Sequence, residues 1–267
     1  MVRLSLVLFI PSLLVAASRA TEPQDLEFTS QLDGTTQRYV ELLPAEFDAE
    51  QMYDVVVALH GHGSDRWQFI KQERGECKGV RDVAAKQGLI LVSPDYRAKT
   101  SWMGPQAEAD VVQIIAELKQ RYSIQRVFIV GGSMGGTSAL IFTALHPELI
   151  AGVCSLNGTA NMIEYAGFQD AISASYGGTK TSLLDEYKKR SPELWPERFT
   201  MPMAMTSGGK DSVVPPDSVL RLAEKLKQAK VPVLSIHRPD GGHATNYDDT
   251  CAAMEFMLNE GKRANKK

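Results

Sequence analysis

The sequence predicts an α/β protein, with a mostly parallel sheet covered by helices on both faces. Short runs of apolar and β-branched residues alternate along the chain with longer amphipathic stretches, and this alternation is typical of strands joined by crossover helices. Residues 55–59 and 127–130 are apolar at every position. Strands of that composition are buried on both faces, as the strands of a parallel sheet are.

The expected elements follow one another in an order that fits such a sheet. Seven strands are predicted, at residues 37–43, 54–60, 89–93, 126–131, 150–156, 201–207 and 233–238. Four clear helices are predicted at residues 106–122, 135–145, 217–228 and 248–258. Pro147 ends the second of these helices, and Asp217 or Ser218 is suited to cap the third.

The first twenty residues have the character of a cleaved secretory signal. Arg3 supplies a positive charge, residues 4–15 are almost wholly apolar, and Ser18 and Ala20 place small residues where a signal peptidase cuts. A bilayer-spanning helix needs about 20 apolar residues, more than this stretch offers; an uncleaved anchor is the alternative. We therefore expect residues 21–267 to form a single secreted or periplasmic domain, without stable membrane insertion.

Composition indicates a globular protein that does not bind nucleic acid. Hydrophobic residues make up 43% of the chain and the net charge is −3, whereas a nucleic-acid interface needs a concentrated basic face. The basic residues gather only in the tail at 262–267, which is typical of a short solvated end.

The three cysteines are too few, and odd in number, for a disulfide framework. Cys154 lies in the apolar run 150–156 and is predicted to be a free thiol in the core. Cys77 and Cys251 fall near one edge of the expected sheet, so a disulfide between them is left open. No spacing of Cys and His is typical of a zinc site, and no metal or cofactor is predicted.

Ser133 lies in a G-x-S-x-G motif formed by residues 131–135. The motif follows the apolar strand 126–131 and opens the helix 135–145, which is the strand–turn–helix context that a nucleophile elbow requires. Glycines beside the serine permit a strained turn, and the new helix directs its N-terminal amides at the reacting oxygen. Ser133 is therefore the predicted nucleophile; the alternative is an ordinary glycine-rich turn.

A serine needs a base to take its proton, and His243 is the best placed of the five histidines. His243 follows the last predicted strand in a Gly-rich turn, Gly241-Gly242-His243. The others lie before the serine, at the end of a helix, or inside a strand: His60, His62, His146 and His237.

The base in turn needs an acid that orients it, and we assign this role to Asp211. Asp211 follows the strand 201–207, so it lies at the same sheet edge as the serine and the histidine. Asp240 is closer in sequence, but a carboxylate three residues from His243 would point elsewhere. The resulting order of Ser, Asp and His is that of one class of serine hydrolase.

Acyl transfer also needs N–H donors for the developing oxyanion. Met134 follows the nucleophile and offers one. The Gly-rich loop 60–64 follows the strand 54–60, and from it we choose the His62 amide as the second donor, with Gly61 and Gly63 left open. The His62 side chain is a candidate for the pocket wall, or else a solvent-facing group.

Four motifs in order, H-G-H-G-S at 60–64, G-G-S-M-G-G at 131–136, G-G-K-D-S-V-V-P at 208–215 and G-G-H-A at 241–244, resemble the α/β-hydrolase superfamily. The match covers nearly all of the chain after residue 20. Within the superfamily it is similar to secreted serine esterases and to the catalytic domains of prolyl-oligopeptidase-type peptidases. The sequence shows no stretch for the large propeller of an oligopeptidase, so we expect an esterase.

Residues 157–200 break the rhythm of strands and helices, because the stretch is far longer than an ordinary connection. It leaves the expected strand 150–156 at the edge that carries the site, so we predict a partial cap with a hinge at Gly177–Gly178. The alternative is a helical connection packed against the side of the sheet. Three aromatic residues are candidates for substrate contact, or else for loop packing: Tyr96, Trp102 and Trp195.

These residues predict a serine hydrolase that cleaves carboxylic esters in two steps through an acyl-enzyme, with Ser133, Asp211 and His243 as its triad. The expected substrate is a small ester, or the acyl group of a polysaccharide or a polyester. A serine peptidase acting on short peptides is the second hypothesis. The third is an inactive binding protein on a hydrolase scaffold, since a fold does not guarantee its function.

Overall fold

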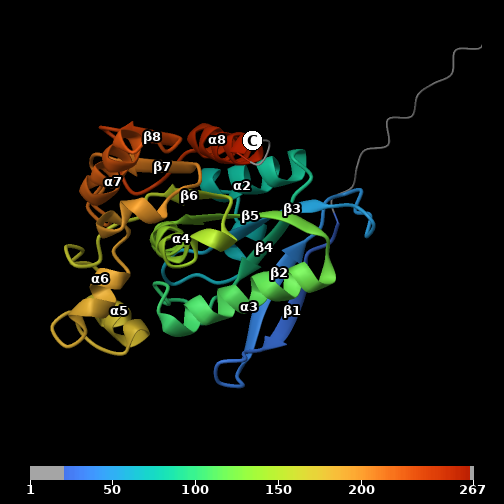
Figure 1. Ribbon diagram of the computed structural model, residues 1–267, viewed down its shortest axis with the longest axis horizontal. Helices are drawn as coiled ribbons and strands as arrows, with labels where there is room; N and C mark the ends of the chain where they lie inside the picture. Colours follow the sequence, from blue (N-terminus) through green and yellow to red (C-terminus); the bar gives the residue numbers. More distant parts are fainter. Residues whose placement is uncertain (1–20, 265–267) are drawn as a thin grey trace, which may run out of the picture.

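The computed structural model describes residues 21–264 and contains an eight-stranded sheet (Figure 1). The predicted secretory signal at residues 1–20 lies outside the described residues. The strands lie in the order β1-β2-β4-β3-β5-β6-β7-β8. From β4 to β8 every pair is parallel, and β1 and β2 join antiparallel at one end. The strands are β1 (Gln24–Thr29), β2 (Thr36–Leu42), β3 (Tyr53–Leu59), β4 (Ile90–Pro94), β5 (Ile124–Gly132), β6 (Gly152–Leu156), β7 (Met203–Gly208) and β8 (Val233–Arg238).

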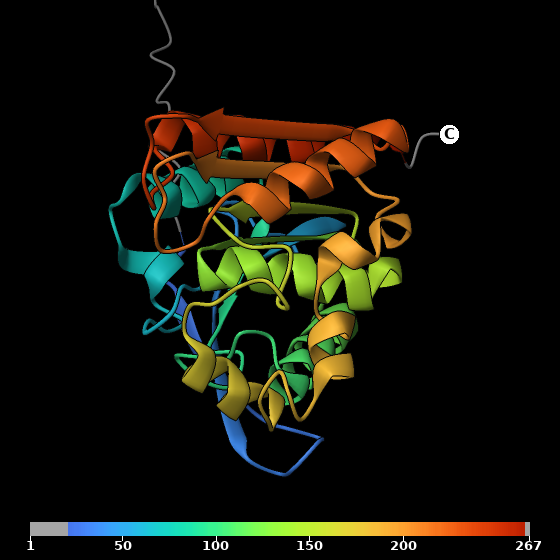
Figure 2. The same ribbon diagram turned by 90° about the vertical axis from the view of Figure 1, so that its left-hand side faces the viewer.

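Helices cover both faces of this sheet, as the sequence predicts (Figures 1 and 2). The α-helices are α1 (Gln68–Lys71), α2 (Gly75–Lys86), α3 (Pro105–Arg121), α4 (Met134–Leu145), α5 (Gln169–Tyr176), α6 (Leu184–Lys189), α7 (Asp217–Gln228) and α8 (Tyr247–Ala264). Side chains of α3, α4 and α7 share one apolar cluster, and those of α1, α2 and α8 share the other. Val55 and Val57 of β3 join the first cluster and Val56 joins the second, so both faces of that strand are buried.

All seven predicted strands and all four predicted helices are present, with bounds shifted by a few residues. The α4 helix ends at Leu145, before Pro147. The α7 helix begins at Asp217, but neither Asp217 nor Ser218 caps it, so that prediction is wrong. The Ser218 hydroxyl instead accepts from the Ala160 amide at 2.9 Å and so fastens another segment of the chain.

All three cysteines are free thiols. Cys154 is buried in β6, which confirms the predicted core thiol, and burial raises its pKa. Cys77 on α2 and Cys251 on α8 are also free, so the disulfide left open by the sequence does not form. Within residues 21–264, no helix has the length and apolar character needed to cross a bilayer.

Candidate active site

The carboxyl ends of the parallel strands meet at one edge of the sheet, where ligand sites of this architecture lie. The loop after β3 carries His62, the turn after β5 carries Ser133, and the loops after β7 and β8 carry Asp211 and His243. The topology therefore gathers the predicted residues from four distant stretches of sequence.

Ser133 occupies a strained turn between β5 and α4. Its φ is 57° and its ψ is −119°, a combination that residues other than glycine rarely adopt. The turn fits because Gly135 follows closely: a β-carbon on Gly135 would lie 1.9 Å from the Leu59 carbonyl oxygen. The strain is thus held by the packing of α4 on β3, and it presents the Ser133 hydroxyl at the edge of the sheet.

Ser133, His243 and Asp211 form a continuous line of hydrogen-bonding groups. The Nε2 of His243 lies 2.8 Å from the Ser133 Oγ, and its Nδ1 lies 2.7 Å from the Asp211 Oδ2. The Asp211 side chain is 1% exposed, and its Oδ1 accepts from the amides of Val213 and Val214 at 2.9 Å each. Asp240 instead pairs with Lys210 in solvent, so it does not compete for the imidazole.

The loop after β3 leaves one of its three candidate amides without a partner. The Gly61 amide donates to the Gln68 Oε1 at 2.9 Å, and the Gly63 amide donates to the Lys99 carbonyl at 2.7 Å. Among the hydrogen bonds of residues 21–264, none uses the His62 amide. Met134 is the first residue of α4, so its N–H also lacks an acceptor within the helix.

Gln68 is a residue that the sequence analysis missed. It is buried beneath the loop, and its side-chain Oε1 accepts the hydrogen bond from the Gly61 amide. A glutamine inside the apolar stretch Trp67-Gln68-Phe69-Ile70 is the signal that could have pointed to it.

These groups open into a cavity of about 430 Å³. Around Ser133 and His243 it is lined by, among others, His62, Gln72, Arg74, Glu76, Asn157, Phe168 and Val213. We refer to this cavity as the cleft.

The His62 imidazole packs against the Trp102 and Phe168 rings, which also contact each other. The Trp102 Nε1 donates to its Nδ1 at 3.1 Å, and the Phe168 ring centroid lies 4.2 Å from its own. Burial lowers the pKa of His62. The neutral ring is the form that can accept this hydrogen bond, so burial and the Trp102 contact favour the same state.

Two of the predicted substrate contacts, Tyr96 and Trp102, do not line the cleft. Tyr96 is buried, and its hydroxyl donates to the His60 carbonyl at 2.6 Å. Trp102 is buried, and its indole N–H holds the His62 ring through the hydrogen bond to Nδ1. The structure therefore places both rings in the core and not at the cleft.

Trp195 is likewise far from the cleft. Its Nε1 donates to the Lys188 carbonyl at 2.9 Å, and its ring packs against Arg198. Arg198 in turn reaches the Ala144 carbonyl near the last turn of α4. Ser133 precedes the first turn of the same helix, about 16.5 Å from Ala144 at 1.5 Å per residue. The structure therefore does not bring Trp195 to the cleft.

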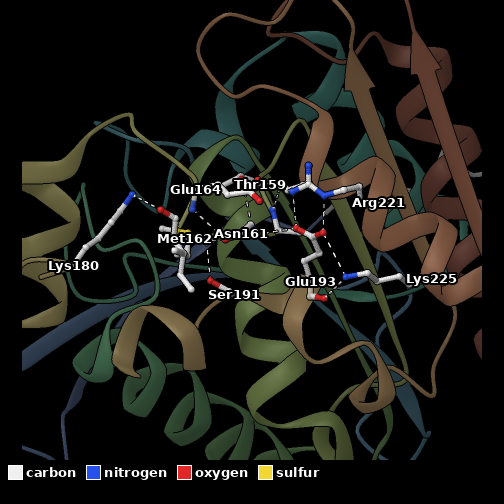
Figure 3. Close-up of polar contacts among 12 residues, drawn as sticks. Thr159, Asn161, Met162, Glu164, Lys180, Ser191, Glu193, Arg221 and Lys225 are labelled. Atoms are coloured by element: carbon white, nitrogen blue, oxygen red, sulfur yellow. Dashed lines mark hydrogen bonds and ion pairs between the residues drawn. The ribbon is translucent and has the colours of Figure 1, made fainter. Parts of the chain in front are cut away.

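The segment 157–200 is fastened to the body of the protein (Figure 3). Two hydrogen bonds lie within the segment, from the Asn161 Nδ2 to Glu193 at 3.0 Å and from the Met162 amide to the Ser191 Oγ at 2.9 Å. Arg221 of α7, outside the segment, pairs with Glu193 at 2.6 Å and ties the segment to the body. Gly177, with a φ of 82°, is the C-cap that ends α5 and is not placed as a hinge.

Only Phe168 and Asn157, near the start of this segment, reach the cleft. The partial cap is therefore reduced to the Phe168 ring, and the remainder matches the alternative of a helical connection packed beside the sheet. α5 and α6 lie together at the side of the molecule, below α4 (Figure 2).

Asn157 is a further residue that the sequence analysis missed. It follows β6 with a φ of 52°, and its amide donates to the Thr206 carbonyl at 3.1 Å. Its Nδ2 donates to the Gly242 carbonyl at 3.4 Å, and its Oδ1 accepts from the Thr245 hydroxyl. The loop that carries His243 is thereby held on both sides of the imidazole.

The chain is similar to known hydrolases in sequence and in structure. The model of the prolyl oligopeptidase family, Peptidase_S9, matches residues 81–259. The "uncharacterized peptidase YtmA" of Bacillus subtilis (strain 168) is 28% identical over 160 residues, which are 56% of this chain and 62% of that protein. The chain thus spans less than two thirds of this relative.

Solved structures share the fold. An acylaminoacyl peptidase of Pyrococcus horikoshii superimposes with a TM-score of 0.70 at 17% identity, over 91% of this chain and 42% of that one. An S-formylglutathione hydrolase of Agrobacterium tumefaciens does so with a TM-score of 0.70 at 16% identity, over 92% of this chain and 98% of that one.

Proposed function

The chain belongs to the prolyl oligopeptidase family of serine hydrolases, and we propose that it cleaves carboxylic esters through an acyl-enzyme on Ser133. The observation that carries the proposal is the line from Ser133 through His243 to the buried Asp211, with both intervals below 3 Å. A neutral histidine in this line can accept one proton at Nε2 while its Nδ1–H donates to the carboxylate.

In the proposed first step the Ser133 Oγ forms a bond to the ester carbonyl carbon, and its proton passes to the His243 Nε2. The carbonyl electron pair moves to oxygen, where the Met134 and His62 amides donate hydrogen bonds to it. Collapse of this intermediate breaks the bond to the alcohol oxygen, which leaves with the proton from His243.

In the second step water attacks the acyl-enzyme with His243 as base, and the same groups release the acid and restore the Ser133 hydroxyl. Asp211 stays ionised throughout, orients the imidazole and stabilises its cationic form. Each step uses groups of this chain alone.

Two observations bear on the bond that is cleaved. The name of the S-formylglutathione hydrolase, which shares the fold, supports an ester-type bond. The name of the Bacillus subtilis relative supports the second candidate, a peptidase acting on short peptides. Both use the same residues, so substrate chemistry must separate them.

Hydrolysis of p-nitrophenyl butyrate and of the matched butyryl p-nitroanilide tests the proposal. The ester is expected to exceed the amide in kcat/KM by several orders of magnitude. Ser133→Ala is expected to lower ester turnover by about 10⁴-fold or more, whereas Ser182→Ala, a change in an exposed turn, leaves it unaltered. An amide cleaved within tenfold of the ester would identify a peptidase instead. A folded protein that neither turns over the ester nor reacts with a fluorophosphonate would be a binding protein.

A further inference from the structure

The residues that line the cleft differ in chemistry. His62, Phe168 and Val213 contribute two rings and an aliphatic side chain. Gln72, Arg74 and Glu76, from the loop before α2 and its first turn, contribute polar and charged groups. No step of the proposed mechanism uses these three residues, which we call the polar wall.

Glu76 reaches close to the nucleophile. A β-carbon placed on Gly132, the residue before Ser133, would lie 3.4 Å from the Glu76 Oε1. The same oxygen lies 2.8 Å from the Nη2 of Arg74, which is the only ion-pair partner of Glu76 within the described part of the chain. The Glu76 side chain is 12% exposed and that of Arg74 is 55% exposed, so the carboxylate is the more buried member of the pair.

The paired charges decide which substrate group fits this wall. The Arg74 guanidinium compensates the charge of the Glu76 carboxylate. A cationic substrate group would therefore be repelled by Arg74, and an anionic group would be repelled by Glu76. An apolar group would remove water from the pair and supply no hydrogen bonds in exchange, which is unfavourable. A hydroxyl both donates and accepts, and it can satisfy a carboxylate, a guanidinium or an amide.

We propose that Gln72, Arg74 and Glu76 form a subsite for a neutral, hydroxylated ring of the substrate, which makes a sugar ester the preferred substrate class. This inference rests on the proposed ester hydrolysis and selects among the ester classes that the sequence leaves open. Glu76 accepts from ring hydroxyls, and Arg74 and Gln72 donate to them.

A matched pair of acetates tests the subsite: a mono-acetylated methyl β-D-xylopyranoside, and cyclohexyl acetate, whose six-membered ring lacks hydroxyls. Acetate release gives kcat/KM for each. The wild type is expected to favour the sugar ester by about 10- to 100-fold, the range for hydrogen bonds to charged groups. Glu76→Ala is expected to remove most of this preference, and Glu76→Gln, which keeps the shape and helix start, to remove part of it. Glu73→Ala is the matched control, because Glu73 lies in the same loop but pairs with Arg81 outside the cleft.

Acetylcholine serves as a third, cationic acetate. Three results would overturn the subsite: equal rates on the first two acetates in the wild type, an unchanged preference in both Glu76 variants, or a fall in kcat/KM of Glu76→Ala for acetylcholine alone. The last result would make Glu76 a site for an ammonium group. Cyclohexyl acetate hydrolysis that depends on Ser133 keeps the proposed function intact in each of these cases. A thermal shift with methyl β-D-xylopyranoside adds a readout without turnover. If no ester is hydrolysed, the proposed function fails. If the xyloside then raises the melting temperature of the wild type and of Glu76→Ala equally, the subsite fails as well.

Discussion

The Thr245 hydroxyl donates to the Asn157 Oδ1 and so ties the end of β6 to the loop that carries His243. Thr206 of β7 completes the contact, because its hydroxyl lies 2.6 Å from that of Thr245. All three side chains are buried. The position of the His243 imidazole therefore depends on a small polar network that begins two residues beyond it. This network joins the His243 loop to β7 and to the end of β6.

Asn157→Gly is expected to lower kcat by about 10- to 100-fold, the range for a catalytic group displaced by about 1 Å. Glycine adopts the φ of 52° without strain, so the backbone is retained while the three side-chain contacts are lost. KM is expected to change little. Steady-state kinetics with a melting curve checks this, and a fall in kcat that is matched by loss of folded protein would count against a positioning role.

Asp211→Asn is expected to lower kcat by about 10⁴-fold, because an amide no longer stabilises the cationic imidazole. Asp240→Asn is the matched control, since that carboxylate is exposed and pairs only with Lys210 among the described residues. Its kcat is expected to equal that of the wild type. If the two variants lose activity equally, the acid has been assigned to the wrong residue.

Phe168→Ala is expected to raise KM several-fold for esters with bulky acyl groups, because the Phe168 ring lines the cleft beside His62. Trp195→Ala provides the comparison, since Trp195 contacts only its own segment and Arg198. Its kinetic constants are expected to stay at wild-type values in the folded fraction. A change in acyl preference from Trp195→Ala would restore the larger cap that the sequence predicts.

Glu108 gives stability a specific dependence on pH. Burial raises its pKa, but the hydrogen bond from His146 and the charge and hydrogen bond of the buried Arg190 outweigh this and lower it to about 2. A carboxyl whose folded pKa lies below its unfolded value stabilises the protein above the unfolded value, near 4.5, and this stabilisation is lost as the pH falls towards 2.

Glu108→Gln is therefore expected to lower the free energy of unfolding by about 2 kcal/mol at pH 7, because Arg190 loses a buried partner. The difference from wild type is expected to shrink between pH 4.5 and pH 2. Urea titrations at several pH values check this, with the exposed Glu197→Gln as control. A difference that does not depend on pH would show that shape, and not charge, explains the loss.

The sequence was sufficient for the parallel sheet and for the spatial meeting of Ser133, His243 and Asp211. Each of these residues follows an apolar strand, and parallel strands bring their carboxyl ends to one edge. β1 was missed because its residues are mostly exposed and polar, so no apolar pattern marks it. The polar wall was missed because Glu76 belongs to a helix start without a motif, far from Ser133 in sequence.

The aromatic predictions failed for a different reason. Tyr96 and Trp102 both follow a strand that ends at the cleft, as predicted, but their φ angles are 31° and 44°. These left-handed turns belong to a loop whose rings are buried in the core. Hydrophobic pattern gives the position of a loop along the chain, but the direction of a side chain within it depends on backbone angles that only the packed structure fixes.

The base of the site follows β8, which is the outermost strand and pairs with β7 alone. Outermost strands open locally at a lower free energy than the centre of a sheet. Transient opening of β8 would withdraw His243 while Ser133, in the turn after the central β5, stays in place. Catalytic activity should therefore disappear at a lower temperature than the bulk of the secondary structure, and amide hydrogens of β8 should exchange with solvent sooner than those of β5.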